Sequence, residues 1–309
     1  MERPVRSRHI GLIMSEPSAL CIAIVGVGGI GSTFAFQLAR AHHHVTAIAR
    51  PGSDRLRQLQ RDGGVVNVRG ERAELRISDS LDEETPYDLV IVTLLAHQLD
   101  AVLPALSRSR AQCIQLMFNQ FDPERLRDAL GAERCAFGMP FVQGSLDKDG
   151  KLTAVIGAAG QKTLMSEQRW VDVFIAAGLP AVREPNMLLW LRCHVPLCIA
   201  FESVSVAGMR RGGGASWREA MRLARGVHAS FALIKGLGYP IYPRFKSWLH
   251  LSPAFVVAGM LWLMSRIKSF RELLATGINE CRALVDVLVV AAAHANPPVA
   301  SDPIQAMKP

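Results

Sequence analysis

The sequence lacks the features that mark several protein classes. Its six cysteines include no C-x-x-C pair, the spacing typical of zinc and redox sites. They lie in apolar surroundings, where free cysteine behaves as a small hydrophobe, so we expect a reducing, cytoplasmic compartment. The cysteines are Cys21, Cys113, Cys135, Cys193, Cys198 and Cys281.

Metal-ligand clusters are also missing. Three consecutive histidines, His42, His43 and His44, stand between a predicted helix and a predicted strand. Neighbouring residues of a regular element cannot all point at one ion, and no carboxylate or cysteine cluster accompanies them. We interpret them as a polar loop and expect no metal site.

No clean apolar run reaches the roughly 18 residues that a membrane-spanning helix requires. The run from Leu249 to Ser265 comes nearest, but Pro253 interrupts it and Arg266 follows it. We interpret it as a buried helix and expect no stable membrane span. Peripheral contact with a membrane is the alternative.

The two ends of the chain differ from the rest. Residues 1–18 contain several arginines but no apolar core of a signal peptide, so we interpret them as an N-terminal extension. Translation starting at Met1 or at Met14 is compatible with this pattern. Residues 298–309 are rich in proline, and we expect them to form a loose tail.

The formal net charge of +8 favours acidic ligands. Seven arginines lie between Arg50 and Arg76, but four acidic residues are interleaved with them and no aromatic platform accompanies them. This pattern is typical of a solvated face, and it does not indicate a nucleic-acid partner.

Buried-strand and helix patterns alternate along the N-terminal half. Strands are predicted at 20–25, 45–49, 87–94 and 113–118, and helices at 30–41, 54–61 and 98–106. Two further strand-like runs, 137–142 and 152–158, flank a turn at 147–150. The alternation predicts a doubly wound α/β domain of the Rossmann type.

Beyond Pro185 the apolar spacing is that of helices. The helix-period runs are 187–209, 216–236, 253–275 and 277–295. A chain of 309 residues is long enough for two domains. We therefore expect a Rossmann-type domain over 19–183 and an all-helical domain over 184–297, the latter serving substrate binding or dimerisation.

A glycine motif follows the first predicted strand directly. Gly26, Gly28 and Gly31 fit G-x-G-x-x-G between a buried strand and a helix. The first glycine permits a tight turn, the second lets a pyrophosphate approach the backbone, and the third lets the helix pack on the sheet. The helix N-terminus then offers free N–H groups to the phosphates. The sequence therefore predicts a dinucleotide site.

The end of the second strand indicates which dinucleotide is bound. An NAD enzyme usually carries an acidic residue there for the ribose hydroxyls, whereas this chain has Arg50. A guanidinium would pair with the 2′-phosphate of NADPH, and Ser53 and Arg55 are placed to assist. We expect NADP as the cofactor.

With these residues, the chain resembles the ketopantoate reductase (2-dehydropantoate 2-reductase) family over about residues 20–300. The resemblance rests on the glycine motif, on residues 44–46 leading to Arg50, on residues 88–94 followed by Ala96 and Gln98, and on Asn119 at a strand end. It implies that NADPH reduces a 2-keto acid, as in pantothenate biosynthesis, in a cleft between the two domains. The cofactor contacts it implies are Gly26, Val27, Gly28, Gly29, Ile30, Gly31, Arg50, Leu94, Gln98 and Asn119, the last beside the nicotinamide.

The catalytic pattern of that family is only partly present. The family has W-x-K-x-x-x-N-x-x-x-N in its first long helix, and the same register here gives Trp190, Arg192, Pro196 and Ala200. The family also has a serine followed eleven residues later by Thr-Glu. Here that register gives Ser265, Thr276 and Gly277, with Glu280 one turn further on.

These departures require new roles. Arginine stays charged, so Arg192 is a candidate for holding a carboxylate or polarising the carbonyl. His194 is a candidate proton donor because imidazole titrates near neutral pH. Asn119, Ser265 and Glu280 are candidates for lining the site. The structural alternatives are a packed or surface histidine at 194 and an ion pair of Arg192 with Glu202 or Glu184.

Two functions are therefore open. The first is an NADP-dependent oxidoreductase acting on the CH-OH group of donors, which reduces a small 2-keto acid or related carbonyl. The second is a non-catalytic NADPH-binding protein that has lost the family's catalytic residues. The expected partner is a small carbonyl substrate, and a homodimer is possible. Four aromatic residues hint at a bulkier substrate: Phe201, Trp248, Phe255 and Trp262.

Overall fold

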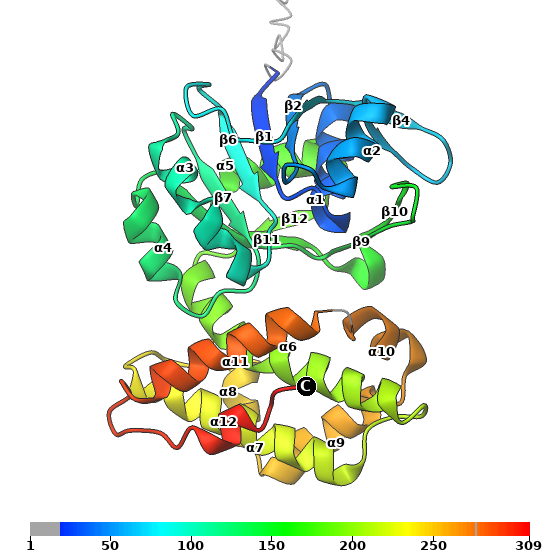
Figure 1. Cartoon of the computed structure of the whole chain (residues 1–309). Coiled ribbons are helices and arrows are strands. Elements are labelled where there is room, and N and C mark those ends of the chain that lie inside the picture. The colour runs from blue at the N-terminus through cyan, green and yellow to red at the C-terminus, as the bar shows by residue number, and fades with distance from the viewer. Residues whose placement is uncertain (1–18, 276) are drawn as a thin grey trace, which may run out of the picture.

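The computed structural model describes residues 19–275 and 277–309, and it folds into an α/β body above a helical body (Figure 1). The α/β body is built on an eight-stranded sheet. Its strands, in spatial order, are β12 (Ala181–Arg183), β11 (Thr163–Met165), β8 (Cys135–Met139), β7 (Ile114–Met117), β6 (Leu89–Val92), β1 (Cys21–Val25), β2 (His44–Ile48) and β5 (Arg76–Ser78). All neighbouring strands pair in parallel except β8 with β11.

Helices cover both faces of the sheet. One face carries α1 (Gly29–Arg40), α2 (Asp54–Asp62) and α5 (Gln168–Ala176); the other carries α3 (Leu103–Arg108), α4 (Pro123–Leu130) and the start of α6 (Met187–Arg210). Strand β1 is buried on both sides, because Ile22 and Ile24 join the first core and Ala23 and Val25 join the second. This is the doubly wound α/β fold that the apolar runs predict.

The direction of winding changes beside β1. Its neighbours are β2 on one side and β6 on the other, and all three strands are parallel. The loops at the carboxyl ends of β1, β6 and β7 therefore meet at one edge of the sheet, where α/β proteins bind their ligands. The loop after β6 continues into the 3₁₀-helix η1 (Ala96–Ala101), in place of the predicted helix from residue 98.

Two hairpins lie outside the main sheet. One pairs β3 (Gly64–Val66) with β4 (Arg72–Glu74), and the other pairs β9 (Val142–Leu146) with β10 (Leu152–Ile156), which precedes the short 3₁₀-helix η2 (Ala158–Gly160). Strand β9 crosses the start of α1 with its backbone in direct contact. A Cβ added to Gly29 would lie 1.9 Å from the carbonyl oxygen of Gly144, so both positions have to be glycine.

The helical body surrounds α6. Its other helices are α7 (Trp217–Gly236), α8 (Arg244–Leu251), α9 (Ala254–Met264), α10 (Lys268–Leu274), α11 (Ile278–Ala292) and α12 (Asp302–Gln305). Helix α6 runs through Pro196 without a break. The helix predicted over 253–275 is in fact two, α9 and α10, because the chain turns at residues 265–267. Helix α8 was not predicted.

Helix α6 is long and apolar enough to cross a bilayer by length and composition, but 72% of its most apolar window is buried inside the fold. It is thus the core helix of the helical body. The only other candidate in the described part of the chain is the pair α8 and α9, which is bent by 115°.

The expectation of a loose tail at 298–309 is wrong. Ile304 and Met307 are completely buried against the helical core, and Ser203 of α6 donates a hydrogen bond to the carbonyl of Met307 at 2.7 Å. The prolines misled the prediction, since Pro303 stands in the first turn of α12, where its missing N–H costs nothing.

Candidate active site

The glycine loop has the geometry that a diphosphate requires. Gly26 turns with a φ of +93°, a conformation that favours glycine, and Gly31 lies so close to the carbonyl of Gly26 that a Cβ would come within 2.2 Å of it. Gly28, in contrast, has open space where a Cβ would stand. The backbone conformation therefore requires glycine at Gly26 and Gly31, whereas Gly28 leaves open space above the N-terminus of α1.

The residues around this loop differ in their burial and in the contacts that hold their side chains. Leu94 packs its side chain against Gly26, and the Gln98 side-chain oxygen accepts a hydrogen bond from the backbone of Leu95 at 3.2 Å. Val27 is buried, whereas Ile30 is half-buried. These residues shape the loop and the wall beside it.

Arg55, which the sequence suggested as an aid to phosphate binding, is committed elsewhere. Its guanidinium donates to the carbonyl of Val27 at 3.0 Å, to the hydroxyl of Ser32 at 2.8 Å and to the carbonyl of Gly150 at 2.9 Å. Burial lowers its pKa to about 10. Arg55 thus joins the glycine loop to the β9–β10 turn.

Arg50 and Ser53 follow β2. The side chain of Ser53 caps α2 by accepting a hydrogen bond from the backbone of Leu56 at 3.2 Å. Arg50 is exposed, and within the described residues it makes no ion pair. Its guanidinium is the one left available at the end of this strand.

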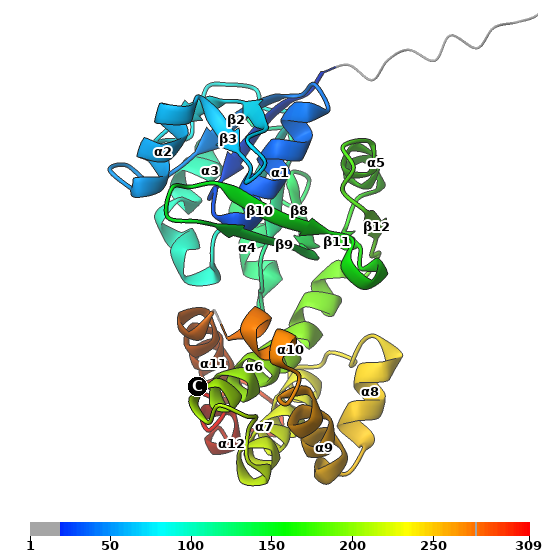
Figure 2. The ribbon, with the colours of Figure 1, turned by 90° about the vertical axis from the view of Figure 1, so that its right-hand side faces the viewer.

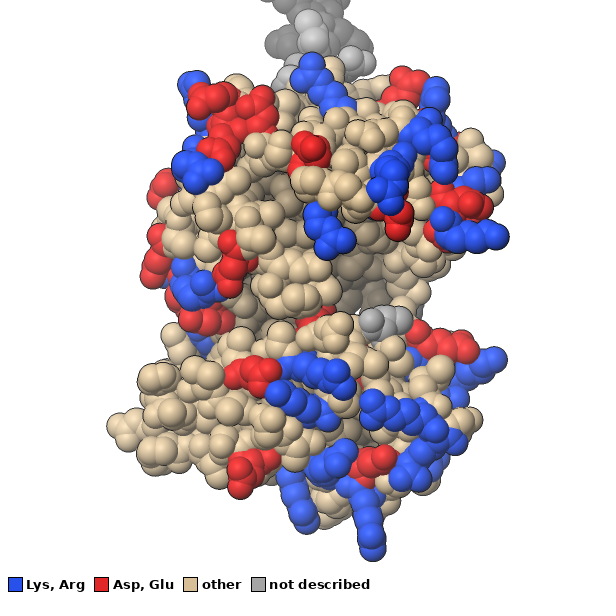
Figure 3. Space-filling model, in the orientation of Figure 1, with Lys and Arg blue, Asp and Glu red and all other residues tan. Residues whose placement is uncertain are grey.

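A second group of side chains meets between the two bodies, where Figure 3 shows the surface hollowed. Asn119, after β7, donates its amide hydrogen to Glu280 of α11 at 3.4 Å and also hydrogen-bonds the thiol of Cys198 on α6. Glu202, one turn after Cys198, lies close to Glu280. The chain thus brings together, from three distant segments, an amide, a thiol and two carboxyl groups, which we call the carboxyl cluster (Asn119, Cys198, Glu202, Glu280).

The carboxyl cluster is short of hydrogen bonds. The side-chain oxygen of Asn119 and Oε1 of Glu202 are buried without a hydrogen-bond partner. Burial, reinforced by the charge of Glu280, raises the pKa of Glu202 to about 7 and outweighs the hydrogen bonds from Cys281 and Gly277. Burial also raises the pKa of Glu280. At pH values below about 7 Glu202 is therefore largely a protonated carboxyl group with free hydrogen-bonding capacity.

His194 lies two turns before Glu202 on α6. Its ring stacks on Trp190 with the centroids 4.5 Å apart. Lys246 of α8 is completely buried on Trp190 as well, 4.3 Å from that ring, and it donates to the Trp190 carbonyl at 3.3 Å. Burial lowers the pKa of Lys246 to about 8. Burial and the charge of Lys246 lower the pKa of His194 to about 3, so this imidazole is neutral near pH 7 and cannot supply a proton.

Arg192 faces a different direction on α6. Its guanidinium forms a two-pronged pair with Glu124 of α4 and stacks over the ring of Tyr239 at 3.7 Å. The guanidinium is buried, and a buried arginine whose charge is already neutralised serves the contact between the bodies. An ion pair was one of the expected alternatives, but its partner is Glu124, not Glu202 or Glu184.

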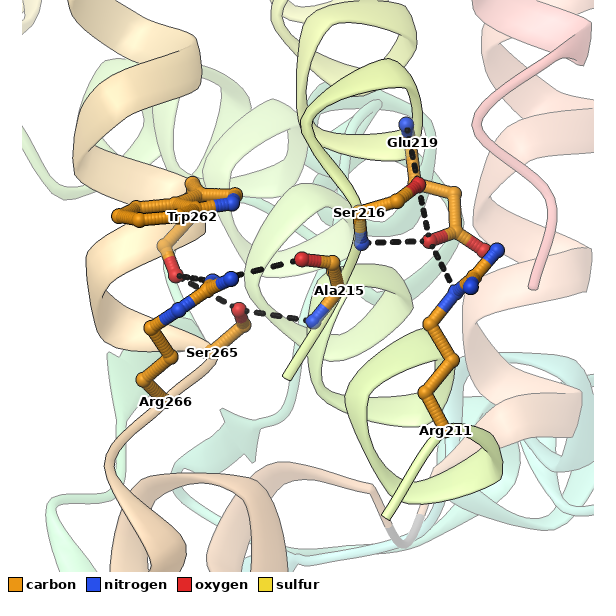
Figure 4. Close-up of polar contacts among 7 residues, drawn as sticks. All are labelled: Arg211, Ala215, Ser216, Glu219, Trp262, Ser265 and Arg266. Carbon is orange, nitrogen blue, oxygen red and sulfur yellow. Dashed lines mark hydrogen bonds and ion pairs between the residues drawn. The ribbon is translucent and has the colours of Figure 1, made fainter. Parts of the chain in front are cut away.

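Ser265 is also removed from the carboxyl cluster. Figure 4 shows its hydroxyl between α9 and α7, where it accepts from the backbone of Ala215 at 3.0 Å and donates to the carbonyl of Trp262 at 2.7 Å. Its side chain is completely buried there. The hydroxyl therefore joins two helices. Thr276, its partner in the family pattern, lies outside the described residues.

Replacing Ser265 by alanine should therefore weaken the fold and leave catalysis intact. The variant leaves the buried N–H of Ala215 without an acceptor, which costs about 1–3 kcal/mol, so we expect the Tm to fall by several degrees. Differential scanning calorimetry and steady-state kinetics of the folded variant measure the two effects. A large loss of kcat/KM at an unchanged Tm would place Ser265 at the substrate instead.

Sequence reasoning missed Cys198 and Lys246, and it considered Glu202 only as a possible ion-pair partner of Arg192. Cys198 and Glu202 carried a usable signal, because His194, Cys198 and Glu202 are spaced by four residues and so share one face of a largely apolar helix. Lys246 carried none. Across the described residues, no three His, Cys, Asp or Glu side chains are gathered so that they could hold a metal ion.

The sequence and the structure resemble known proteins over different lengths of the chain. No curated protein matches the sequence. The chain is similar in structure to a PanE/ApbA family ketopantoate reductase from Ralstonia eutropha JMP134, with a TM-score of 0.71, 17% identity and coverage of 93% of this chain and 95% of that one. A D-mandelate dehydrogenase solved with NADH gives a TM-score of 0.70 at 15% identity, covering 93% and 96% of the two chains.

A third similar structure is the putative 2-dehydropantoate 2-reductase from Enterococcus faecalis, with a TM-score of 0.61, 15% identity and coverage of 94% of this chain and 96% of that one. At these identities the likeness establishes the fold. The sequence itself matches the family model of ketopantoate reductase PanE/ApbA over residues 22–164. Residues 22–164 thus form a domain of the ketopantoate reductase PanE/ApbA type, and nearly the whole chain has the fold of the similar solved structures.

Proposed function

We propose that the chain is an NADPH-dependent oxidoreductase that reduces a small 2-keto acid or a related carbonyl compound to the alcohol in the cleft between its two bodies. The observation that carries the proposal is the buried carboxyl group of Glu202, which has a pKa of about 7 and an unpartnered oxygen beside Asn119 and Glu280. A proton donor that titrates near the working pH is what carbonyl reduction requires.

The glycine loop fits the cofactor. The free side of Gly28 and the N-terminus of α1 would receive the diphosphate, and Arg50 would pair with the 2′-phosphate. When bound, the nicotinamide supplies the hydride. The carboxyl ends of β1 and β7 lie on the same edge of the sheet, so the loop carrying Asn119 lies on the side of the diphosphate site.

Residues of the carboxyl cluster would then neutralise the negative charge that develops on the substrate oxygen. Glu202, protonated, donates its proton to that oxygen, and its neighbour Glu280 keeps the proton in place beforehand by disfavouring a second negative charge. Asn119 holds Glu280 in position and offers its free side-chain oxygen to a hydrogen-bond donor. Neutral His194 can donate one ring N–H to orient the substrate.

Replacing Arg50 by alanine tests the choice of NADPH over NADH. A charge-assisted hydrogen bond contributes about 1.5–3 kcal/mol, so we expect NADPH affinity to fall about 10- to 100-fold and NADH affinity to stay within about twofold. Calorimetric titration with both nucleotides measures this. Arg57→Ala is the matched control, because Arg57 is exposed on α2 and pairs with Asp54. Equal NADPH affinity in the parent and in Arg50→Ala would refute the assignment.

Turnover separates this function from that of a non-catalytic NADPH-binding protein. NADPH oxidation followed by absorbance, with a panel of 2-keto acids that differ in side-chain size, should reveal at least one substrate. Tight NADPH binding with no oxidation on any member of the panel would favour the binding protein. Absence of NADPH binding would contradict both.

A further inference from the structure

Helix α9 has an apolar surface that the fold leaves uncovered. The sequence from Leu251 to Ser265 contains no charged residue, yet Phe255 and Leu263 are exposed. Between them Gly259 faces open space, since a Cβ added there would meet nothing within 4 Å. Phe255, Gly259 and Leu263 repeat every four residues, so one side of α9 is apolar and bare along its length. A helix that is apolar all round is normally buried.

Helix α8 extends this surface. It presents Phe245, Trp248 and Leu251 to solvent, and Leu251 is 77% and Trp248 60% exposed. The chain then bends by 115° into α9, so that Leu251 and Phe255 flank the bend. Figure 2 shows α8 and α9 on the outer side of the helical body, away from the sheet. We call this surface the apolar corner (Phe245, Trp248, Leu251, Phe255, Leu263).

Trp248 and Phe255 were expected to indicate a bulky substrate. Their exposure on the outside of the helical body removes that argument, because neither lines the cleft. The other two aromatic residues of that group also pack elsewhere: Phe201 contacts Phe270, and Trp262 contacts Trp217.

The region that carries the apolar corner is strongly basic. Residues 210–268 contain ten lysines and arginines and a single acidic residue, Glu219, so they hold more positive charge than the +8 of the whole chain. Arg244 adjoins the corner at the start of α8, and Arg266 and Lys268 adjoin it after α9. Figure 3 shows how densely Lys and Arg gather over parts of the helical body.

We propose that the apolar corner docks on the surface of an anionic lipid bilayer. Exposed tryptophan, phenylalanine and leucine beside a basic region are the composition of interfacial membrane anchors, in which the apolar side chains enter the headgroup boundary and the cations meet anionic lipids. The bend between α8 and α9 places Leu251 and Phe255 at the point that enters the bilayer first.

A second copy of the chain is a poorer occupant of this surface. In a twofold symmetric contact the same patch meets itself, so the basic residues Arg244, Arg266 and Lys268 of one copy would be brought close to those of the other. Lys268 pairs with Glu272, but no ion pair within the described residues neutralises Arg244 or Arg266, so their like charges oppose such a contact, whereas an anionic bilayer neutralises them. The charge of the region thus selects the bilayer.

The test is cosedimentation of the full chain with vesicles. We expect binding to vesicles made of equal parts phosphatidylcholine and phosphatidylglycerol, weakening as salt is raised, and little binding to phosphatidylcholine alone. On binding, tryptophan emission should shift to the blue and be quenched by brominated acyl chains. The double variant Trp248→Ser/Leu251→Ser should bind at least about tenfold more weakly.

Val290→Ser is the matched control, because Val290 of α11 is 66% exposed but lies outside the apolar corner. It should bind the anionic vesicles like the parent. The melting temperature and NADPH affinity of all variants should equal those of the parent, since the altered side chains are exposed. The proposal is overturned if the parent ignores anionic vesicles, or if the double variant binds them equally well. It is also overturned if the parent is a dimer that the double variant converts to a monomer without any change in vesicle binding.

Discussion

Glu202→Gln should lower kcat about 10²- to 10⁴-fold and leave KM nearly unchanged, because the glutamine keeps the shape of the side chain but has no proton to give to the forming alkoxide. Glu202 is buried, and the pKa of about 7 means that the parent protein retains this proton over the lower part of the neutral range. Steady-state kinetics on the best 2-keto acid substrate measure the loss.

The pH profile gives a signature that a structural role would not produce. A carboxyl group donates its proton only below its pKa, so kcat of the parent should fall as the pH rises through about 7, and the falling limb should be absent in Glu202→Gln. The charge of Glu280 contributes to this raised pKa, so Glu280→Gln should move the limb to lower pH. Glu272→Gln, on the exposed side of α10, should change neither. Full activity with an unaltered profile in Glu202→Gln would assign the proton to another group.

Gly28→Ala should weaken NADPH binding by about 100-fold or more while leaving the melting temperature unchanged. The open space beside Gly28 accepts a methyl group when no ligand is present, and its φ of −70° suits alanine. The same methyl group would occupy the space that the diphosphate needs. Calorimetric titration gives the affinity, and scanning calorimetry gives the stability.

Substitutions at two other glycines serve as comparisons for this experiment. Gly213→Ala is the neutral comparison, since Gly213 also has open space where a Cβ would stand but lies far along the chain in the helical body. Gly31→Ala should instead destabilise the fold, because its Cβ would strike the carbonyl of Gly26. If Gly28→Ala binds NADPH as tightly as the parent, the diphosphate does not lie over this loop.

The sheet and the glycine loop could be predicted because their signals are local. Strand β1, the glycines after it and the start of α1 are contiguous in the sequence. The conformation of each segment is therefore indicated by its own residues. The start of the long helix near residue 187 likewise follows the change in apolar spacing beyond Pro185, whereas strands β11 and β12 were not predicted.

The catalytic face of α6 was harder because the resemblance supplied the wrong register. Counting from Trp190 led to Arg192, Pro196 and Ala200, whereas the structure brings Cys198 and Glu202 to the domain contact, two residues further along. A two-residue shift rotates a helical position by about 200°, so Arg192 faces Glu124 of α4 instead of the carboxyl cluster.

Other features depend on contacts that no local pattern reveals. Lys246 stands far from Trp190 in the sequence, and only tertiary packing buries it on that ring. The proline-rich end of the chain reads as a loose segment until Met307 is seen to fill a space in front of Gly226. Proline content indicates how the backbone of a segment can bend, but it does not predict whether the segment packs against the rest of the protein.

The crossing of β9 over the start of α1 constrains how this protein can be altered. Gly29 and Gly144 touch through their backbones, so a larger residue at either one separates the hairpin from the helix whether or not a nucleotide is bound. A library that randomises the loop to change cofactor preference would lose substitutions at Gly29 during selection for expression, before any nucleotide was offered. Loss of substitutions at Gly29 would then reflect the packing of the fold, whereas loss of substitutions at Gly28 would reflect nucleotide binding.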